Sequence, residues 1–154
     1  SNSAVNSYKR LNAPRTLSGA TWSPNTITYG GNNRTHMVRI PDAGRIELRL
    51  PDGSANPYLM PAAILSAGLD GIHRNLDPGP RLDVNAYAEP EALKGFKQLP
   101  LNLLDALRAL EADEPLATRM GEETVSAFVK LKTAEWNAFK SHLTEWEREN
   151  TLDC

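Results

Sequence analysis

The sequence has little cysteine and no excess of charge of either sign. Its 154 residues include a single cysteine, Cys154 at the last position, so no disulfide can form within the chain and no cysteine zinc site can be built. Lys and Arg number 17 against 19 Asp and Glu, a net charge of −2. This balance implies no bulk attraction to nucleic acid or to an acidic membrane surface, so any basic chemistry must be local.

The sequence also has no long hydrophobic run. The densest apolar stretch, residues 58–69, is interrupted by Pro61, Ser66 and Gly68 and is shorter than the roughly 20 residues of a membrane span. The first residues show no secretory pattern and no initiator Met, which is typical of a processed or truncated piece. We therefore expect a soluble, cytoplasmic protein of about one domain, without membrane or nucleic-acid partners.

The local patterns predict an α+β fold in which antiparallel strands precede a helical C-terminal half. Residues 1–33 are rich in Asn, Ser, Gly and Pro and indicate an irregular loop region with one short strand near Thr28. Residues 34–50 predict a hairpin with a turn at 41–44. If Arg39 lies opposite Arg45, then Met37 lies opposite Glu47 on the same polar face.

Residues 56–149 indicate mainly helix. Asn56 and Pro57 suit the start of a helix to about Arg74, which is apolar nearly all round and should be buried in the fold or in an assembly. Residues 81–98 indicate an ordered loop. Asn102 and Asp113 suit the starts of two short helices, Gly121 suits the end of the second, and a final helix is predicted over residues 122–149.

One hairpin face concentrates charge, and we call Arg34, Arg39, Arg45, Glu47 and Arg49 the arginine face. Alternating charge on a strand pair is most often a solvated surface. The chemical alternative is that converging guanidiniums neutralise phosphate or carboxylate groups while the lone carboxylate holds a divalent cation. Spacing alone favours the solvated surface.

Longer motifs change that balance because they resemble the C-terminal part of the glutamine synthetase catalytic domain. The similar segments, which lie in matching order over residues 6–87, are Asn6-Ser-Tyr-Lys-Arg10, Asn33-Arg-Thr35, Val38-Arg-Ile-Pro41, Arg45-Ile-Glu-Leu-Arg49, Ala55-Asn-Pro-Tyr58 and Ala67-Gly-Leu-Asp-Gly-Ile72. The resemblance implies a ligase that phosphorylates the γ-carboxylate of glutamate with ATP and then lets an amine displace phosphate.

The resemblance also implies roles for individual residues. Arg10 and Arg49 would bind glutamate, Arg49 through the α-carboxylate. Arg34 and Arg39 would stabilise the phosphates during transfer, Arg45 would help bind the nucleotide, and Glu47 would ligate Mg²⁺ or Mn²⁺. Such a role agrees with the chemistry, because a hard cation prefers oxygen ligands and a transferring phosphoryl group needs fixed positive charge. Glu47 alone cannot hold a catalytic metal.

Two departures from the family pattern bear on function. Ammonia-using members typically carry Tyr-Glu-Ala-Pro on a flap where this chain has Thr21-Trp-Ser-Pro24, so Trp22 occupies the place of the glutamate. Indole cannot accept a proton from ammonium, although it can exclude water and pack against an alkyl group. This resembles the branch that includes γ-glutamylmethylamide synthetases and type III glutamine synthetases, so methylamine rivals ammonia as the amine.

The second departure is that the family's N-terminal domain and upstream catalytic strands have no counterpart in this sequence. The family forms stacked rings of identical subunits, so we expect the intact protein to be a homo-oligomer and this chain alone to be inactive. Ammonia is the first choice of amine, and a noncatalytic assembly or regulatory module is the alternative of another class.

Whether Tyr87 is modified is left open, and the three histidines, which lack metal spacing, suit ordinary structural roles.

Overall fold

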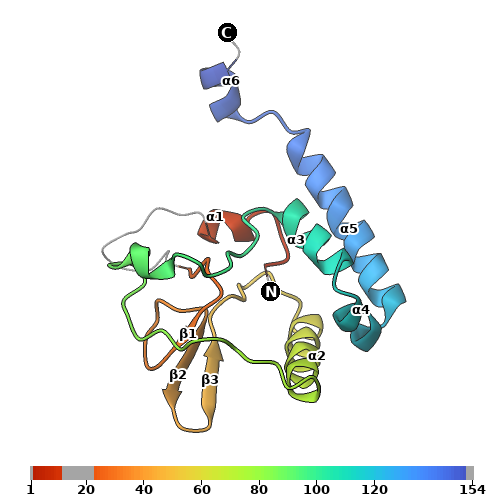
Figure 1. Cartoon of the computed structure of the whole chain (residues 1–154). Helices are drawn as coiled ribbons and strands as arrows, with labels where there is room; N and C mark the ends of the chain where they lie inside the picture. The colour runs from red at the N-terminus through yellow and green to blue at the C-terminus, as the bar shows by residue number, and fades with distance from the viewer. Residues whose placement is uncertain (1, 12–22, 152–154) are drawn as a thin grey trace.

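The computed structural model describes residues 2–11 and 23–151, which form a small sheet and a set of helices (Figure 1). In chain order the elements are α1 (Ser7–Leu11), β1 (Tyr29–Gly30), β2 (Val38–Asp42), β3 (Arg45–Leu48), α2 (Leu59–His73), the 3-10 helix η1 (Pro90–Leu93), α3 (Leu103–Glu111), α4 (Glu114–Met120), α5 (Glu122–Lys140) and α6 (Glu145–Thr151). The predicted α+β class with a helical C-terminal half is confirmed.

The sheet is mixed, whereas the sequence suggested antiparallel strands only. Its order is β1-β2-β3; β1 runs parallel to β2, and β2 runs antiparallel to β3. The loop after α2 runs beside β1, because Leu82 N–H donates to the Tyr29 carbonyl at 3.0 Å. Strand β1 therefore lies between β2 and residues 82–86.

The hairpin register differs from the arrangement considered for Arg39 opposite Arg45. Arg39 pairs with Glu47, and Asp42 pairs with Arg45 around a turn where Gly44 has φ of +74°. Between these pairs β2 carries one residue more than β3, at Ile40 and Pro41. Pro41 has no N–H to donate to the neighbouring strand, so an irregularity at this position costs little stability. The register shift places Arg39 opposite Glu47 and Asp42 opposite Arg45, so opposite charges face each other across the hairpin.

The hydrophobic core lies where α1, α3 and α5 meet. Its buried members are Tyr8, Leu11, Leu103, Leu107, Val125 and Val129. The sequence did not indicate α1, because five residues are too few for a recognisable periodicity. The helix exists because Tyr8 and Leu11 bury their side chains against the later helices, so residues 7–11 are not part of an irregular loop.

The helix boundaries follow capping chemistry at three predicted positions. The Asn102 side chain accepts from Asp105 N–H at 2.9 Å, and Asp113 accepts from Leu116 N–H at 3.1 Å. Gly121, with φ of +89°, separates α4 from α5. These three residues begin or end helices as the sequence predicted, because each satisfies backbone groups that a helix end leaves unpaired or adopts a conformation that favours glycine.

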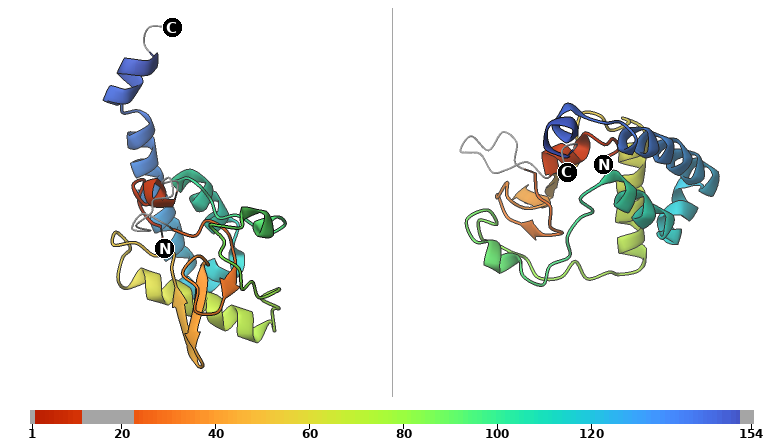
Figure 2. Two further views of the ribbon diagram at one scale, coloured as in Figure 1. Left: turned by 90° about the vertical axis from the view of Figure 1, so that its left-hand side faces the viewer. Right: turned by 90° about the horizontal axis from the view of Figure 1, so that it is seen from above.

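The single final helix predicted over residues 122–149 is wrong, because the chain breaks between α5 and α6. Glu147 accepts from Thr144 N–H at 2.8 Å, and Thr144 Oγ1 accepts from Glu147 N–H at 3.2 Å. This reciprocal pair is a capping box, which starts a new helix. Helix α6 consequently projects from the body beyond the end of α5 (Figures 1 and 2).

Helix α2 begins after Asn56, whose side chain accepts from the N–H groups of Tyr58 and Leu59 at 2.9 and 3.0 Å. None of its residues is buried, and Leu65 and Ile72 are 66% and 75% exposed. The expectation that this helix is buried within the fold is therefore wrong for this chain, and burial in an assembly stays a prediction. In the described part of the chain, no helix is long and apolar enough to cross a membrane.

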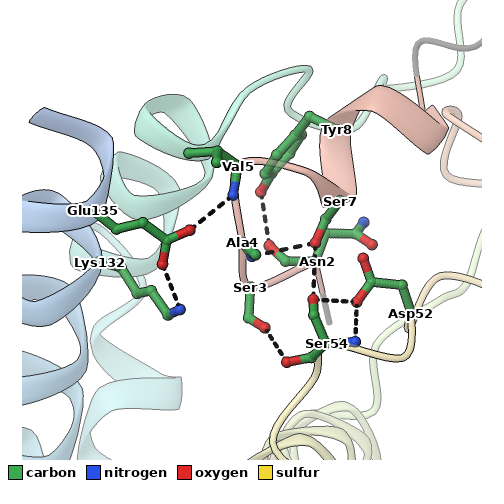
Figure 3. Close-up of polar contacts among 10 residues, drawn as sticks. All are labelled: Asn2, Ser3, Ala4, Val5, Ser7, Tyr8, Asp52, Ser54, Lys132 and Glu135. Atoms are coloured by element: carbon green, nitrogen blue, oxygen red, sulfur yellow. Dashed lines mark hydrogen bonds and ion pairs between the residues drawn. The ribbon is translucent and has the colours of Figure 1, made fainter. Parts of the chain in front are cut away.

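Residues 2–8 connect the two halves of the fold (Figure 3). Val5 N–H donates to Glu135 of α5 at 3.0 Å, and Lys132 pairs with the same carboxylate at 2.7 Å. On the other side, the Ser7 and Ser54 hydroxyls lie 3.3 Å apart. The segment that leads to Arg10 is thus held between α5 and the loop that follows the hairpin.

Candidate functional site

The centre of the site is a carboxylate between two arginines. Arg39 Nη1 lies 2.6 Å from Glu47 Oε2, and Arg49 Nε lies 3.3 Å from Glu47 Oε1. The register places Arg39 directly across from Glu47, and Arg49 follows two residues later on the same side of the chain. The hairpin therefore builds the pairing that joins these three side chains.

The pairing keeps Glu47 ionised. The hydrogen bond from Arg39 holds the pKa of the Glu47 carboxyl below its ordinary value, and the charges of Arg39, Arg49 and Arg34 lower it further against a smaller desolvation effect. Because the charge of Arg34 reaches this carboxylate, Arg34 belongs to the same electrostatic group. Two guanidiniums thus contact one carboxylate and the charge of a third acts on it, so the group retains an excess of positive charge.

Arg39 is fixed before any ligand binds. Its side chain is only 15% exposed, and its Nε donates to Asn32 Oδ1 at 2.9 Å. One end of the guanidinium is thus held by an amide and the other by Glu47. A cation held on both sides loses little conformational freedom when an anion arrives, which is the preorganisation that stabilises developing charge.

Arg34 is exposed and sits in a turn whose backbone is tightly bonded. Asn33 Oδ1 accepts from both the N–H and the hydroxyl of Thr35, at 2.9 and 2.8 Å. Thr35 Oγ1 in turn accepts from Ala86 N–H at 3.0 Å. The neighbours of Arg34 on both sides are therefore anchored, while its own side chain is free to meet a ligand.

Arg10 lies behind the end of the hairpin. Its guanidinium donates to the Leu50 carbonyl and, at 3.2 Å, to Asn2 Oδ1. Leu50 directly follows Arg49, so Arg10 and Arg49 are at the same end of the arginine face. Among the described residues, Arg10 Nε is buried and has no hydrogen-bond partner.

Arg45 is separate from this group. It pairs with Asp42 at 2.7 Å across the hairpin turn, and its side chain is 65% exposed. The structure thus brings together Arg34, Arg39, Glu47 and Arg49, places Arg10 beside Arg49, and leaves Arg45 in its own ion pair. Trp22 lies outside the residues that the structure describes.

Sequence reasoning missed the polar groups that hold the arginines. Asn32 fixes Arg39, and Asn33 and Thr35 fix the turn around Arg34. His36 is completely buried beneath that turn. A buried histidine amid polar residues gives no periodic signal, so only the tertiary structure identifies it.

The donor set does not by itself make a metal site. In the parts of the chain that are described, no three His, Cys, Asp or Glu residues gather closely enough to hold an ion. Both Glu47 oxygens face guanidiniums, so the carboxylate can supply one ligand only if those ion pairs loosen. What the face can do unaided is bind and neutralise an anion such as phosphate or carboxylate.

The chain is similar to known proteins over nearly its whole length. Residues 1–151 match the family model described as the catalytic domain of glutamine synthetase. A glutamine synthetase of Rhizobium leguminosarum bv. phaseoli is 62% identical over 152 residues, which are 99% of this chain and 35% of that protein. A glutamate–methylamine ligase of Methyloversatilis universalis is 48% identical over 97% of this chain and 34% of its own length.

Solved structures give the same result. A GmaS/ADP complex superposes with a TM-score of 0.91 and 72% sequence identity, covering 99% of this chain and 35% of the other. The chain therefore spans about a third of the length of the relatives it matches.

Proposed function

Because the chain belongs to the family of glutamine synthetase catalytic domains, we propose that the protein containing it is an ATP-dependent ligase that forms the γ-amide of glutamate from ammonia. The observation that carries this proposal is the joined group of Arg34, Arg39 and Arg49 around the ionised Glu47. Phosphoryl transfer needs little covalent help from a protein but does need fixed positive charge around the transferring group.

The chain would form the C-terminal part of the catalytic domain. It spans 35% of the Rhizobium relative, and the described residues contain no group of three His, Cys, Asp or Glu that could hold a metal ion. The remaining nucleotide and metal contacts would come from the rest of the intact protein. We place that protein in the cytoplasm as a ring-forming homo-oligomer, by the resemblance to its family.

The reaction would proceed in two steps. A γ-carboxylate oxygen of glutamate attacks the terminal phosphorus of ATP, the bond to the bridging oxygen breaks, and γ-glutamyl phosphate and ADP form. The amine then attacks the γ-carbonyl carbon, phosphate leaves with the bonding electrons, and the amine nitrogen loses a proton. Arg34 and Arg39 would stabilise the charge on the transferring phosphoryl oxygens.

The other end of the arginine face would hold the amino acid. Arg49 would bind the α-carboxylate of glutamate as a planar, bidentate donor, and Arg10 would add a second guanidinium beside it. The contact between Arg10 and the Leu50 carbonyl supports this role, because it sets the two arginines at one place. Arg45 would contact the nucleotide after leaving its exposed pair with Asp42.

A divalent ion, Mg²⁺ or Mn²⁺, would screen the phosphate charges when bound, with Glu47 as one of its ligands. The lowered pKa of Glu47 supports this role, because the carboxylate is ionised at neutral pH.

The test is glutamate-dependent release of ADP by the intact protein that contains this chain, measured with ammonium and with methylamine. We expect release with ammonium, and we expect the 154-residue chain alone to be inactive. Release that is absent with both amines would overturn the proposal and favour a noncatalytic assembly or regulatory module.

Methylamine is the second candidate amine, and one sequence feature favours it. Trp22 stands where ammonia-using relatives carry a glutamate, and the Methyloversatilis relative is a glutamate–methylamine ligase. An indole can pack against a methyl group and exclude water from an acyl phosphate. Faster ADP release with methylamine than with ammonium would assign the protein to this activity.

Exchanging Trp22 for glutamate tests the role of the flap. We expect Trp22→Glu to raise the ratio of ammonium to methylamine turnover by about tenfold or more, because a carboxylate can accept a proton from ammonium. The measurement is kcat/KM for each amine with the wild type and the variant. The control is Trp146→Glu, because Trp146 is exposed whereas Trp136 packs on the core. An unchanged ratio would remove this reason to consider methylamine.

A further inference from the structure

We propose that His36 is a positioning residue, a neutral imidazole that fixes the turn carrying Arg34 to the loop over residues 82–86. This role rests on the proposed function, because Arg34 is the group whose geometry it would set. His36 has no exposed surface, and it lies in the chain between Arg34 and Arg39. Nothing in the sequence suggested more than a structural role for it.

Both ring nitrogens of His36 have partners on other segments. Nδ1 lies 3.1 Å from Thr28 Oγ1, next to β1, and Nε2 lies 3.0 Å from the Val84 carbonyl. The ring thus spans from the segment before β1 to the loop that follows α2. Its own backbone belongs to the turn, so three segments meet at one side chain.

The partners determine which nitrogen carries the proton. A carbonyl can only accept, so Nε2 must donate to Val84 O. A neutral ring then accepts at Nδ1 from the Thr28 hydroxyl at 3.1 Å, a shorter contact than the 3.5 Å from that hydroxyl to its other acceptor, the Thr26 carbonyl. Burial lowers the pKa of His36, while the Val84 carbonyl and Asp83 raise it; Asp83 is itself paired with Arg81 at 2.7 Å. The neutral Nε2–H form satisfies the two shortest contacts of the ring, those with Thr28 and Val84.

The same carbonyl connects His36 to the Arg34 turn. Asn33 Nδ2 donates to Val84 O at 2.7 Å, so Val84 O accepts from both Asn33 and His36. Asn33 Oδ1 accepts from the Thr35 hydroxyl, and Thr35 Oγ1 accepts from Ala86 N–H. Loss of the His36 donor would therefore loosen the residues on both sides of Arg34 while leaving its guanidinium intact.

The ring of His36 leaves no room for a side chain at Gly30. A Cβ at Gly30 would lie 2.6 Å from His36 Cδ2 and 2.5 Å from the Leu82 carbonyl oxygen. Glycine at this position lets β1 approach the ring closely. The imidazole therefore packs tightly between Gly30 of β1 and the Val84 carbonyl, as expected of a side chain that fixes the position of the Arg34 turn.

The test compares His36→Leu with His36→Gln in the intact protein, by ADP release with saturating and limiting ATP and glutamate. Leu removes both ring contacts, whereas the Gln amide can still donate to Val84 O. We expect His36→Leu to lower kcat about 10- to 100-fold with little change in either KM, because a displaced Arg34 weakens the transition state more than the ground state. We expect His36→Gln to recover most of that loss.

Two further variants keep the test decisive. Thr28→Val preserves volume and removes only the hydroxyl that donates to Nδ1, so it should lower kcat by about threefold or more even if His36→Leu does not fold. His142→Leu, on the exposed chain after α5, should leave kcat unchanged. An active wild type whose kcat is insensitive to Thr28→Val, a His36→Gln variant as slow as His36→Leu, or a His36→Leu variant that loses only thermal stability would overturn the positioning role. A wild type without glutamate-dependent ADP release would overturn the proposed function and this role with it.

Discussion

At the scale of single residues, the site depends on a balance of charge that Glu47 completes. Without a carboxylate between them, Arg39 and Arg49 would repel each other at close range. With it, both are held in place, and the face still carries more positive than negative charge. Arg39 is held additionally by Asn32, so an incoming anion meets a guanidinium that is already oriented.

This balance makes stability depend on pH through Glu47. The folded-state pKa of Glu47 lies below its ordinary value of 4.5, so the stabilisation is fully present above that value and is lost as pH falls through the lowered pKa. We expect Glu47→Gln to unfold at a lower temperature than the wild type at pH 7 and at the same temperature once both are strongly acidic. Thermal unfolding followed by circular dichroism across this range measures the difference.

Glu149→Gln, which alters an exposed carboxylate on α6, is the matched control and should change the unfolding temperature little at any pH. A difference between Glu47→Gln and the wild type that stays constant down to strongly acidic pH would mean that the ion pairs with Arg39 and Arg49 do not stabilise the fold.

At the scale of elements, β1 is short, but its Gly30 lies directly against the His36 ring and the Leu82 carbonyl. Gly30→Ala would drive a methyl group into the Leu82 carbonyl and the His36 ring, neither of which can move far. We expect it to lower the free energy of unfolding by about 2 kcal/mol, the usual range for overpacking a rigid site. Gly53→Ala is the control, because a Cβ there meets no atom within 4 Å.

The stabilities of Gly30→Ala and Gly53→Ala are compared by their midpoints of unfolding in urea. A Gly30→Ala variant as stable as Gly53→Ala would show that β1 does not approach His36 as closely as the structure indicates, and it would also weaken the positioning role of the ring.

The elements that the sequence predicted correctly are those with a local physical signal. The caps at Asn102, Asp113 and Gly121 depend on the residue itself and its nearest backbone groups, so they could be found without tertiary information. The break before α6 also had a local signal, the Thr144 and Glu147 capping box, which the continuing amphipathic pattern obscured.

The parts that could not be predicted depend on contacts between distant segments. The pairing of Arg39 with Glu47 required a β-bulge near Pro41, and parity alone does not reveal a bulge. Helix α1 forms only because Tyr8 and Leu11 have α3 and α5 to pack against. The candidate arginines came from motifs, whereas Asn32 and His36 became visible only when the loops around them were placed.

At the scale of the whole molecule, the described residues form a core cluster, and the arginine face lies outside it. Leu103 is 2% exposed at the centre of that core, whereas Leu65 on α2 is 66% exposed. We expect Leu103→Ala to lower the free energy of unfolding by about 3 kcal/mol and Leu65→Ala by less than about 0.5 kcal/mol. Chemical unfolding of the chain measures both, and equal losses would contradict the assignment of the core.

The exposed face of α2 and the projecting α6 also bear on the whole molecule. Leu65, Ile72 and Trp146 expose much of their apolar surface in this chain. The chain spans about a third of its relatives, and in the proposed ring-forming homo-oligomer further residues and copies would cover such surfaces. The loss of stability on Leu65→Ala should therefore be larger in the intact protein than in the chain.

The measurement that tests the proposed ligase most directly is glutamate-dependent ADP release by Arg34→Ala in the intact protein. Arg34 is exposed and acts on Glu47 through its charge, so we expect a loss in kcat of about 100-fold or more with little change in the unfolding temperature. Arg108→Ala, which removes an exposed arginine from α3, should keep wild-type turnover. Turnover by Arg34→Ala equal to that of the wild type would contradict the role of the arginine face in phosphoryl transfer.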